Sequence, residues 1–186
     1  GADLAEITVA GFAPVDLAGA RRLLELPALT DTALARALRL LRLDPDAPTP
    51  SCEALLHAFL PAPFVVHTHA DSVLAVLDSR HGKRLAAELW GEDHLIVPYR
   101  KPGFDLARQV RDLWLAAGES ARRWTGIVLL HHGIFTFGSS ARESYERMLA
   151  TVDRARRRLP PAARRPVART ADANASGRAA WTTLDV

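Results

Sequence analysis

The sequence predicts an α/β fold with one sheet that is mixed or antiparallel. Short apolar runs rich in β-branched residues alternate with segments of helical periodicity, which is the pattern of an α/β chain. Two of these runs, at 127–131 and 134–137, are too close together for the helical crossover that a parallel pair needs. The 186 residues, 48% of them hydrophobic, are enough for one domain with a sizeable core.

The N-terminal third of the chain predicts one strand and three helices. The strand is expected at 7–10, and the helices at 17–26, 32–43 and 51–60. Asp16 and Asp31 stand before the first two helices, where a short acceptor side chain caps free N–H groups. Prolines 45, 48 and 50 cannot continue the second helix, because proline removes a backbone donor and fixes φ.

The next part of the chain, up to residue 159, predicts four strands and four helices. The strands are expected at 64–69, 95–99, 127–131 and 134–137, and the helices at 71–77, 83–90, 104–117 and 140–159. Ser140 and Glu143 have the spacing of a capping box at the start of the last helix. We therefore expect a domain at residues 1–159. Residues 160–186, rich in Ala, Arg and Pro, are expected to form a linker or a disordered tail.

The distribution of charge argues against a nucleic-acid-binding surface on the domain. The net charge is +3, but residues 151–186 contain eight arginines and three acidic residues, which leaves −2 for the first 150 residues. Nucleic-acid binding needs a clustered positive surface, so no nucleic-acid partner is expected.

Features of membrane or secreted proteins are missing from the sequence. No apolar run approaches the length of about 20 residues that spans a membrane, and the start shows no signal-peptide pattern. The single cysteine, Cys52, rules out an intrachain disulfide framework and fits a reducing compartment. We expect a cytoplasmic protein with no membrane partner.

Two apolar runs end in histidine, which indicates a metal site. Side chains alternate along a strand, so His67 and His69 point to the same side. The run at 127–131 leads into His132, which we favour as the third ligand over His131 because a turn glycine follows it. Three imidazoles with an open fourth position are typical of catalytic zinc. The alternative is that a histidine at a strand end is structural.

Glu53 is the candidate group for proton transfer. The alternative interpretation is that an acid in the first turn of a helix interacts with the helix dipole and has no catalytic role. His57, four residues later, could pair with Glu53 on the same helix face. His81 and His94 suggest no role, and Cys52 has no recognisable nucleophile context. The chain has no glycine-rich nucleotide loop and no Gly-x-Ser-x-Gly elbow, which argues against nucleotide-binding and serine-hydrolase functions.

Three motifs, in this order and spacing, resemble the class II aldolase/adducin family. They are Pro50-Ser51-Cys52-Glu53, His67-Thr68-His69 and Leu129-Leu130-His131-His132-Gly133. The likeness covers about residues 1–159 and is strongest to the aldolase half of bifunctional rhamnulose-1-phosphate aldolase/short-chain dehydrogenase proteins. It implies a three-layer α/β/α fold around a mixed, largely antiparallel sheet, with N-terminal elements of the family lying upstream of this chain.

The resemblance also implies an activity and a set of site residues. Zn²⁺ would be held by His67, His69 and His132, and Glu53 would be the catalytic carboxylate. Ser51 would contact substrate phosphate, while Cys52 replaces a second serine that is frequent in the family. The expected reaction is aldol cleavage of a ketose 1-phosphate, such as rhamnulose 1-phosphate, to dihydroxyacetone phosphate and an aldehyde.

Other features of the family leave alternatives open. The main phosphate-anchoring loop would lie upstream of Gly1, and no tyrosine of this chain stands where some relatives place a catalytic acid. An epimerase or dehydratase of the same fold would use the same histidines, and an adducin-like member would be a non-catalytic interaction module. The likeness further implies a homotetramer and a dehydrogenase domain after the tail.

Overall fold

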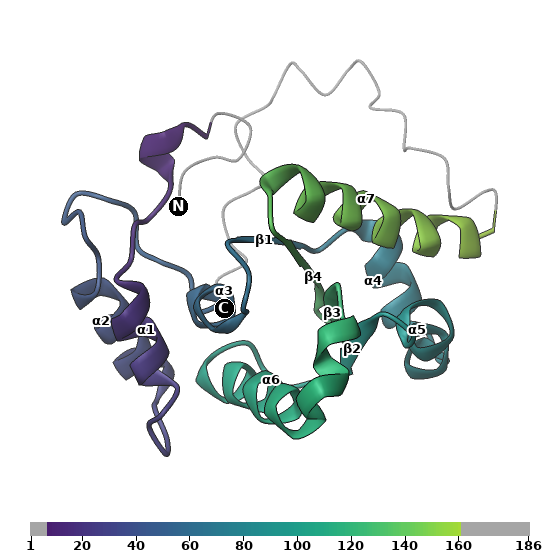
Figure 1. Ribbon diagram of the computed structural model, residues 1–186, viewed down its shortest axis with the longest axis horizontal. Helices are drawn as coiled ribbons and strands as arrows, with labels where there is room; N and C mark the ends of the chain where they lie inside the picture. Colours follow the sequence, from purple (N-terminus) through teal and green to yellow (C-terminus); the bar gives the residue numbers. More distant parts are fainter. Residues whose placement is uncertain (1–6, 161–186) are drawn as a thin grey trace, which may run out of the picture.

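The computed structural model describes residues 7–160. Four strands and seven α-helices are found there, with two short 3₁₀ helices, η1 and η2 (Figure 1). In chain order they are η1 (Val9–Gly11), α1 (Leu17–Leu23), α2 (Asp31–Leu40), α3 (Ala54–Phe59), β1 (Phe64–Thr68), α4 (Asp71–Leu77), α5 (Gly82–Trp90), β2 (His94–Val97), α6 (Phe104–Ala117), η2 (Gly118–Arg123), β3 (Gly126–Leu129), β4 (Gly133–Gly138) and α7 (Ala141–Arg158). All but one residue of the predicted tail, 160–186, lies outside the described residues.

The four strands form one sheet in the order β1-β4-β3-β2. β4 is antiparallel to both β1 and β3, whereas β2 and β3 are parallel. The parallel pair is connected through α6 and η2, while β3 turns directly into β4. The prediction of a mixed, largely antiparallel sheet is confirmed. The β1–β4 pairing places His67 opposite Phe135, far away in the sequence.

Helices cover both faces of the sheet and make three layers (Figure 1). On β3, Ile127 and Leu129 belong to the core on one face of the sheet, while Val128 and the following Leu130 belong to the core on the other. Residues of α1, α2, α3 and α6 contribute to the first core, with α1 and α2 outermost in Figure 1, and residues of α4, α5 and α7 contribute to the second. A sheet buried on both faces explains why residues 127–130 are all apolar. The expected α/β/α architecture is confirmed.

The strand predicted at 7–10 is wrong. The chain forms η1 there instead, and the Gly11 N–H donates to the Thr8 carbonyl over 2.9 Å, which closes a turn. A run of four β-branched and small residues has little strand preference without a partner strand, and glycine favours the turn. The predicted lengths of the first helices were also too great, since α1 ends at Leu23 and α2 at Leu40.

Side-chain capping contacts fix the starts of α1, α2 and α7. Asp16 accepts from the N–H groups of Ala18 and Gly19, as expected, but α2 is capped by Thr30 and not by Asp31. The capping box predicted at the start of α7 is shifted by one residue, because the Glu143 side chain accepts from the N–H of Ser139 and not from that of Ser140. Ser140 Oγ accepts from the Glu143 N–H over 3.1 Å, and Glu143 Oε2 accepts from the Ser139 N–H over 2.6 Å. Among residues 7–160, no helix is long and apolar enough to cross a membrane.

A polar network ties α7 to the start of β2. The Arg154 guanidinium makes two contacts with the Asp93 carboxylate, at 2.7 and 2.6 Å, and His94 Nδ1 lies 2.8 Å from the same carboxylate. His94 is 2% exposed, and its Nε2 reaches Thr151 Oγ1 on α7 over 3.1 Å. Arg154 lowers the pKa of Asp93 to about 2, although burial acts in the opposite direction, and His94 adds to the lowering. His94 therefore has a structural role in this network, which the sequence did not suggest.

Replacing Asp93 should give a pH-dependent loss of stability. The carboxyl has an ordinary pKa of 3.8 and a folded pKa of about 2, so its contribution is present above about pH 4 and is lost as the pH falls toward 2. We expect Asp93→Asn to lower the free energy of unfolding by about 1 kcal/mol at pH 7, after allowance for the partial exposure of the pair. Urea unfolding of wild type and variant from pH 7 to pH 2 measures this. A difference that stays constant to pH 2, or an equal loss in the exposed control Asp46→Asn, would contradict the assignment.

Candidate metal centre

The end of β1 brings His67 and His69 together. The alternation predicted from the sequence is present, and the two Nε2 atoms are 2.9 Å apart. The Nδ1 of His67 lies 2.8 Å from the Ile134 carbonyl, an acceptor, so Nδ1 carries the proton. The Nε2 of His67 therefore presents its lone pair toward His69. Two imidazole nitrogens at this distance share either one proton or one cation.

The turn between β3 and β4 adds His132. Because β4 pairs with β1, this turn lies beside the end of β1, and the His132 ring centroid is 4.9 Å from that of His69 and 5.5 Å from that of His67. His131 takes the left-handed conformation, with φ of 59°, and its Nδ1 contacts Asp78 Oδ1 over 3.0 Å instead. The structure thus places His132, and not His131, with the other two histidines, as the sequence predicted.

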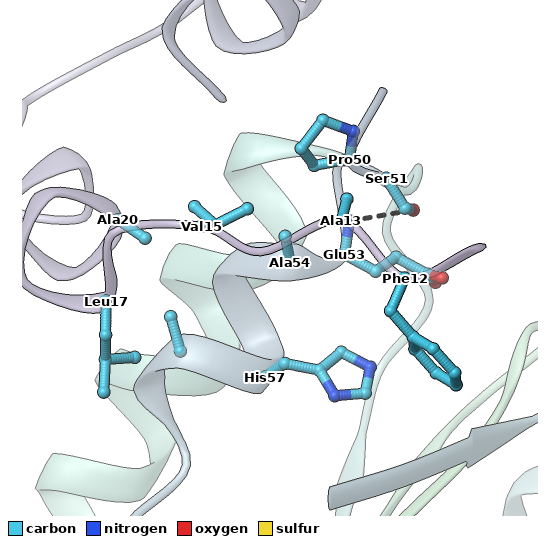
Figure 2. A pocket seen from close by; sticks show the side chains of 11 residues that line it. Phe12, Ala13, Val15, Leu17, Ala20, Pro50, Ser51, Glu53, Ala54 and His57 are labelled. Carbon is cyan, nitrogen blue, oxygen red and sulfur yellow. Dashed lines mark hydrogen bonds between the residues drawn. The ribbon is translucent and has the colours of Figure 1, made fainter. Parts of the chain in front are cut away.

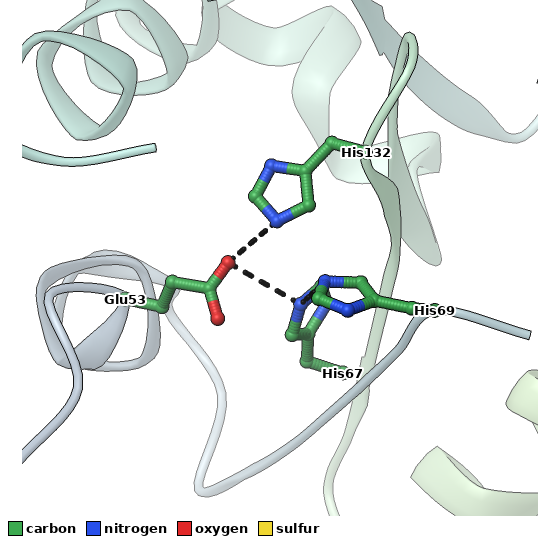
Figure 3. A group of neighbouring side chains, drawn as sticks. All are labelled: Glu53, His67, His69 and His132. Atoms are coloured by element: carbon green, nitrogen blue, oxygen red, sulfur yellow. Dashed lines mark hydrogen bonds and ion pairs between the residues drawn. The ribbon is translucent and has the colours of Figure 1, made fainter. Parts of the chain in front are cut away.

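Glu53 reaches the same point from the start of α3. Its Oε1 lies 2.7 Å from His132 Nε2 and 3.3 Å from His67 Nε2 (Figure 3). Oε1 is a buried oxygen that is not counted in any hydrogen bond within the described part of the chain, although both imidazoles lie close to it. The Glu53 side chain makes no capping bond to α3. Its position is therefore not explained by the helix end alone.

The electrostatics of the site favour an ionised Glu53 and a neutral His69. Burial would raise the pKa of the Glu53 carboxyl, but His132 and His67 outweigh it and hold the pKa well below its usual range. Burial, followed by repulsion from His67 and His132, lowers the pKa of His69. At neutral pH Glu53 therefore offers an anionic oxygen and His69 a bare imidazole nitrogen, which are the forms that bind metal.

These groups fit a zinc ion. One ligand atom each from Glu53, His67, His69 and His132 lies within 4.8 Å of every other, and no further such group occurs among residues 7–160. Zinc bonds of about 2.0–2.2 Å to nitrogen and oxygen place tetrahedral ligands roughly 3.3–3.6 Å apart. The spacing seen here needs only small side-chain shifts to match that value. The unsatisfied Glu53 Oε1 and the facing nitrogens of His67 and His69 are both explained by a cation between them.

The comparisons with known proteins agree with this geometry. The family model described as "Class II Aldolase and Adducin N-terminal domain" matches residues 1–159. This chain belongs to the class II aldolase and adducin family. The group of three histidines and Glu53, which could hold a metal ion, is consistent with membership of this family.

Two relatives show how far the family likeness extends. A Bacillus subtilis (strain 168) protein, "Uncharacterized oxidoreductase YuxG", is 31% identical over 156 residues, which are 83% of this chain and 22% of that protein. The solved N-terminal class II aldolase domain of a conserved protein from Thermoplasma acidophilum is 33% identical, with a TM-score of 0.74 over 84% of this chain and 70% of that one. This class II aldolase domain thus spans about a fifth of its curated relative.

The sequence did not reveal the groups that orient the clustered histidines of this domain. His67 stacks on Phe135 with ring centroids 3.9 Å apart and an interplanar angle of 14°. Phe135 is fully buried, so its stacked ring fixes the ring plane of His67. The Ile134 carbonyl fixes the same ring through its contact with His67 Nδ1. Only the β1–β4 register brings these residues together, and no local pattern in the sequence signals it.

Gly133 has no room for a side chain because His67 and His69 pass close to it. A Cβ there would lie 2.7 Å from His69 Cδ2 and 2.7 Å from the Thr68 carbonyl oxygen, and 3.3 Å from His67 Cε1. We expect Gly133→Ala to weaken zinc binding about 10- to 100-fold, as changes to groups that orient ligands do. The substitution should also lower the free energy of unfolding by about 1–3 kcal/mol, because the Thr68 carbonyl oxygen belongs to the backbone and cannot move aside. Competition with a chromophoric chelator measures the affinity, and unchanged zinc affinity would contradict the close approach.

A cavity opens beside Glu53 in the aldolase domain. We call it the Glu53 cavity; it has a volume of about 470 Å³ (Figure 2). Ser51 lies at its edge, where Ser51 Oγ accepts from the Glu53 N–H over 3.2 Å and so shapes the turn that carries the carboxylate. His57 also faces it. The expected pairing of His57 with Glu53 is not formed, and its ring instead contacts Phe135, with centroids 5.4 Å apart.

Proposed function

We propose that this domain catalyses metal-dependent aldol cleavage of a ketose 1-phosphate of the rhamnulose 1-phosphate kind, giving dihydroxyacetone phosphate and an aldehyde. The observation that carries the proposal is the meeting of three imidazoles and one buried carboxylate at the edge of a cavity. Membership of the class II aldolase and adducin family supports the reaction class. A non-catalytic interaction module would have no need for such a group.

In this proposal His67, His69 and His132 hold Zn²⁺. A zinc ion bound there would act as a Lewis acid that stabilises negative charge on the ketone oxygen while the carbon–carbon bond breaks. The three histidines come from a strand end and an adjacent tight turn, so the sheet fixes their spacing. The Ile134 carbonyl holds the tautomer of His67 that leaves Nε2 free for the metal.

Glu53 is proposed to move the proton. In aldol cleavage the bond between C3 and C4 breaks, its electron pair stays on C3, and a proton passes in sum from the C4 hydroxyl to C3. A carboxylate that is ionised and buried beside the bound ketose is suited to carry that proton. Ser51, at the edge of the same cavity, is proposed to contact the substrate phosphate.

The whole protein is proposed to hold more than this domain. The curated relative is named an oxidoreductase and is several times longer than the matched segment, which supports a dehydrogenase domain in the same polypeptide. A homotetramer and a cytoplasmic location stay predictions from the resemblance. Size-exclusion chromatography with light scattering of the chain measures the first of these.

An assay of cleavage with and without metal tests the proposed function. Rhamnulose 1-phosphate is supplied, and dihydroxyacetone phosphate is detected through its enzymatic reduction. We expect turnover that a chelator abolishes and that added zinc restores, because the ketone oxygen loses its charge stabilisation without the ion. Turnover that survives complete removal of metal would contradict a class II mechanism, and a zinc-loaded protein that cleaves no ketose 1-phosphate would contradict aldol cleavage altogether.

A further inference from the structure

Phe135 touches two residues of the site that come from different elements. Its ring stacks on His67 of β1, with ring centroids 3.9 Å apart and an interplanar angle of 14°. The same ring meets His57 of α3 edge-on, with centroids 5.4 Å apart. His57 stands one helical turn after Glu53, which occupies the N-cap position of α3. One buried ring therefore connects a proposed metal ligand with the helix that carries the carboxylate.

Two consecutive residues of β4 hold the His67 ring from two directions. The Ile134 carbonyl oxygen lies 2.8 Å from His67 Nδ1, and the Phe135 ring covers one face of the imidazole. The side chain of Ile134 belongs to the core on the opposite side of the sheet, so Phe135 is the residue that places its side chain against His67. A hydrogen bond at one nitrogen lets the ring tilt about that bond, and a flat surface against its face removes this freedom.

The rest of the metal centre is arranged around His67. Its Nε2 lies 2.9 Å from His69 Nε2 and 3.3 Å from Glu53 Oε1. Within residues 7–160, the rings of His69 and His132 contact no aromatic ring except the imidazoles of the centre itself. A tilt of the His67 ring would change both Nε2 distances at once, and a metal with fixed bond lengths tolerates such a change poorly.

We propose that Phe135 is a positioning residue: its ring keeps His67 and the start of α3 in one fixed relation, which places Glu53 correctly at the metal centre. The proposal rests on the proposed aldolase function, to which it adds a residue that acts through His67 and α3. Packing alone would require only a side chain that fills the volume at position 135. Positioning requires the flat face of an aromatic ring, because that face lies parallel to the imidazole.

Zinc affinity tests this role without catalysis. Phe135→Leu removes the ring that stacks on His67, and Phe104→Leu is the matched control, because Phe104 is buried in the same core at the start of α6. Both variants should melt at a lower temperature than wild type, since each loses buried contacts. We expect only Phe135→Leu to bind zinc about tenfold more weakly, in competition with a chromophoric chelator. Wild-type zinc affinity in Phe135→Leu, or an equal loss in Phe104→Leu, would overturn the proposal.

The conservative variant separates the effect of the ring from the stability of the core. Phe135→Tyr keeps the flat face but buries a hydroxyl group, so it should lower the melting temperature and still bind zinc as wild type does. The absorption spectrum of the cobalt-loaded protein reports the ligand geometry, and it should change in Phe135→Leu but not in Phe135→Tyr. Equal losses of zinc affinity in these two variants would mean that Phe135 acts only through core stability, which overturns the proposal.

Phe135→Met covers the case in which either of these variants fails to fold. Methionine is flexible and fills irregular space in a core, but it has no flat face. We therefore expect a folded protein that still binds zinc about tenfold more weakly than wild type. A methionine variant with wild-type zinc affinity would contradict the need for an aromatic ring.

Kinetics at saturating zinc test the link to α3. Phe135→Leu should lower kcat for cleavage of rhamnulose 1-phosphate about tenfold and leave KM within about twofold, because a displaced Glu53 affects the chemical step more than substrate binding. An unchanged kcat would overturn the link to α3. If the wild-type chain cleaves no ketose phosphate while the zinc affinities follow the expected order, the aldolase function fails and the role of Phe135 at the metal centre stands.

Discussion

His132→Ala is expected to abolish aldol cleavage and to weaken zinc binding by at least about 100-fold. Changes to groups that merely orient a ligand cost about 10–100-fold, so removal of a ligand itself should cost more. The variant also takes the nearest imidazole away from Glu53, whose Oε1 lies 2.7 Å from His132 Nε2. Zinc affinity is measured by competition with a chromophoric chelator, and activity by release of dihydroxyacetone phosphate.

The neighbouring histidine provides the matched control. His131→Asn removes an imidazole one position away, and asparagine tolerates the left-handed backbone, with φ of 59°, that His131 adopts. The His131 ring contacts Asp78 and Tyr99 outside the metal centre. We expect this variant to keep zinc affinity within about threefold of wild type, since surface contacts of this kind contribute little. If His131→Asn weakened zinc binding as much as His132→Ala does, the assignment of His132, and not His131, as a metal ligand would be wrong.

Glu53→Gln is expected to reduce turnover by about 10²- to 10⁴-fold while the protein keeps zinc. That range is the usual contribution of a positioned proton-transfer group. Glutamine has the shape of glutamate but cannot accept and return a proton, and the three imidazoles remain to hold the metal. Steady-state kinetics and metal analysis of the same preparation separate the two effects. The loss should fall on kcat more than on KM.

The control for this substitution is an exposed glutamate remote from the site. Glu25→Gln, just beyond α1, removes the same charge and should leave both turnover and zinc content unchanged. Loss of zinc in Glu53→Gln would show that the carboxylate is needed as a fourth ligand. Turnover close to that of wild type would refute a proton-transfer role for Glu53.

The candidate site could be predicted because its chemistry lies in short, local patterns. Strand alternation places His67 and His69 on one side, and the glycine after His132 indicates the turn that separates it from His131. Both are properties of a few consecutive residues. The pairing of β1 with β4, which brings the two motifs together, was not predicted and is seen only in the structure.

What the sequence could not supply depends on long-range register. Phe135 supports His67 because the two residues are opposite each other across β1 and β4. A side chain at position 133 is excluded by atoms of His69 that lie close to Gly133. The Glu53 cavity forms where the segment before α1 meets α3, about forty residues later. The wrongly predicted strand at 7–10 has the same origin, since no strand within residues 7–160 pairs with it.

Metal content tests the central claim most directly. The wild-type chain and the variants His67→Ala and His69→Ala are incubated with zinc and dialysed against metal-free buffer, and bound metal is then measured by inductively coupled plasma mass spectrometry. The account predicts one zinc ion per wild-type chain and far less in each variant, because each loses one of the ligands gathered within 4.8 Å. A wild-type chain that retains no zinc, or variants that retain as much as wild type, would contradict it.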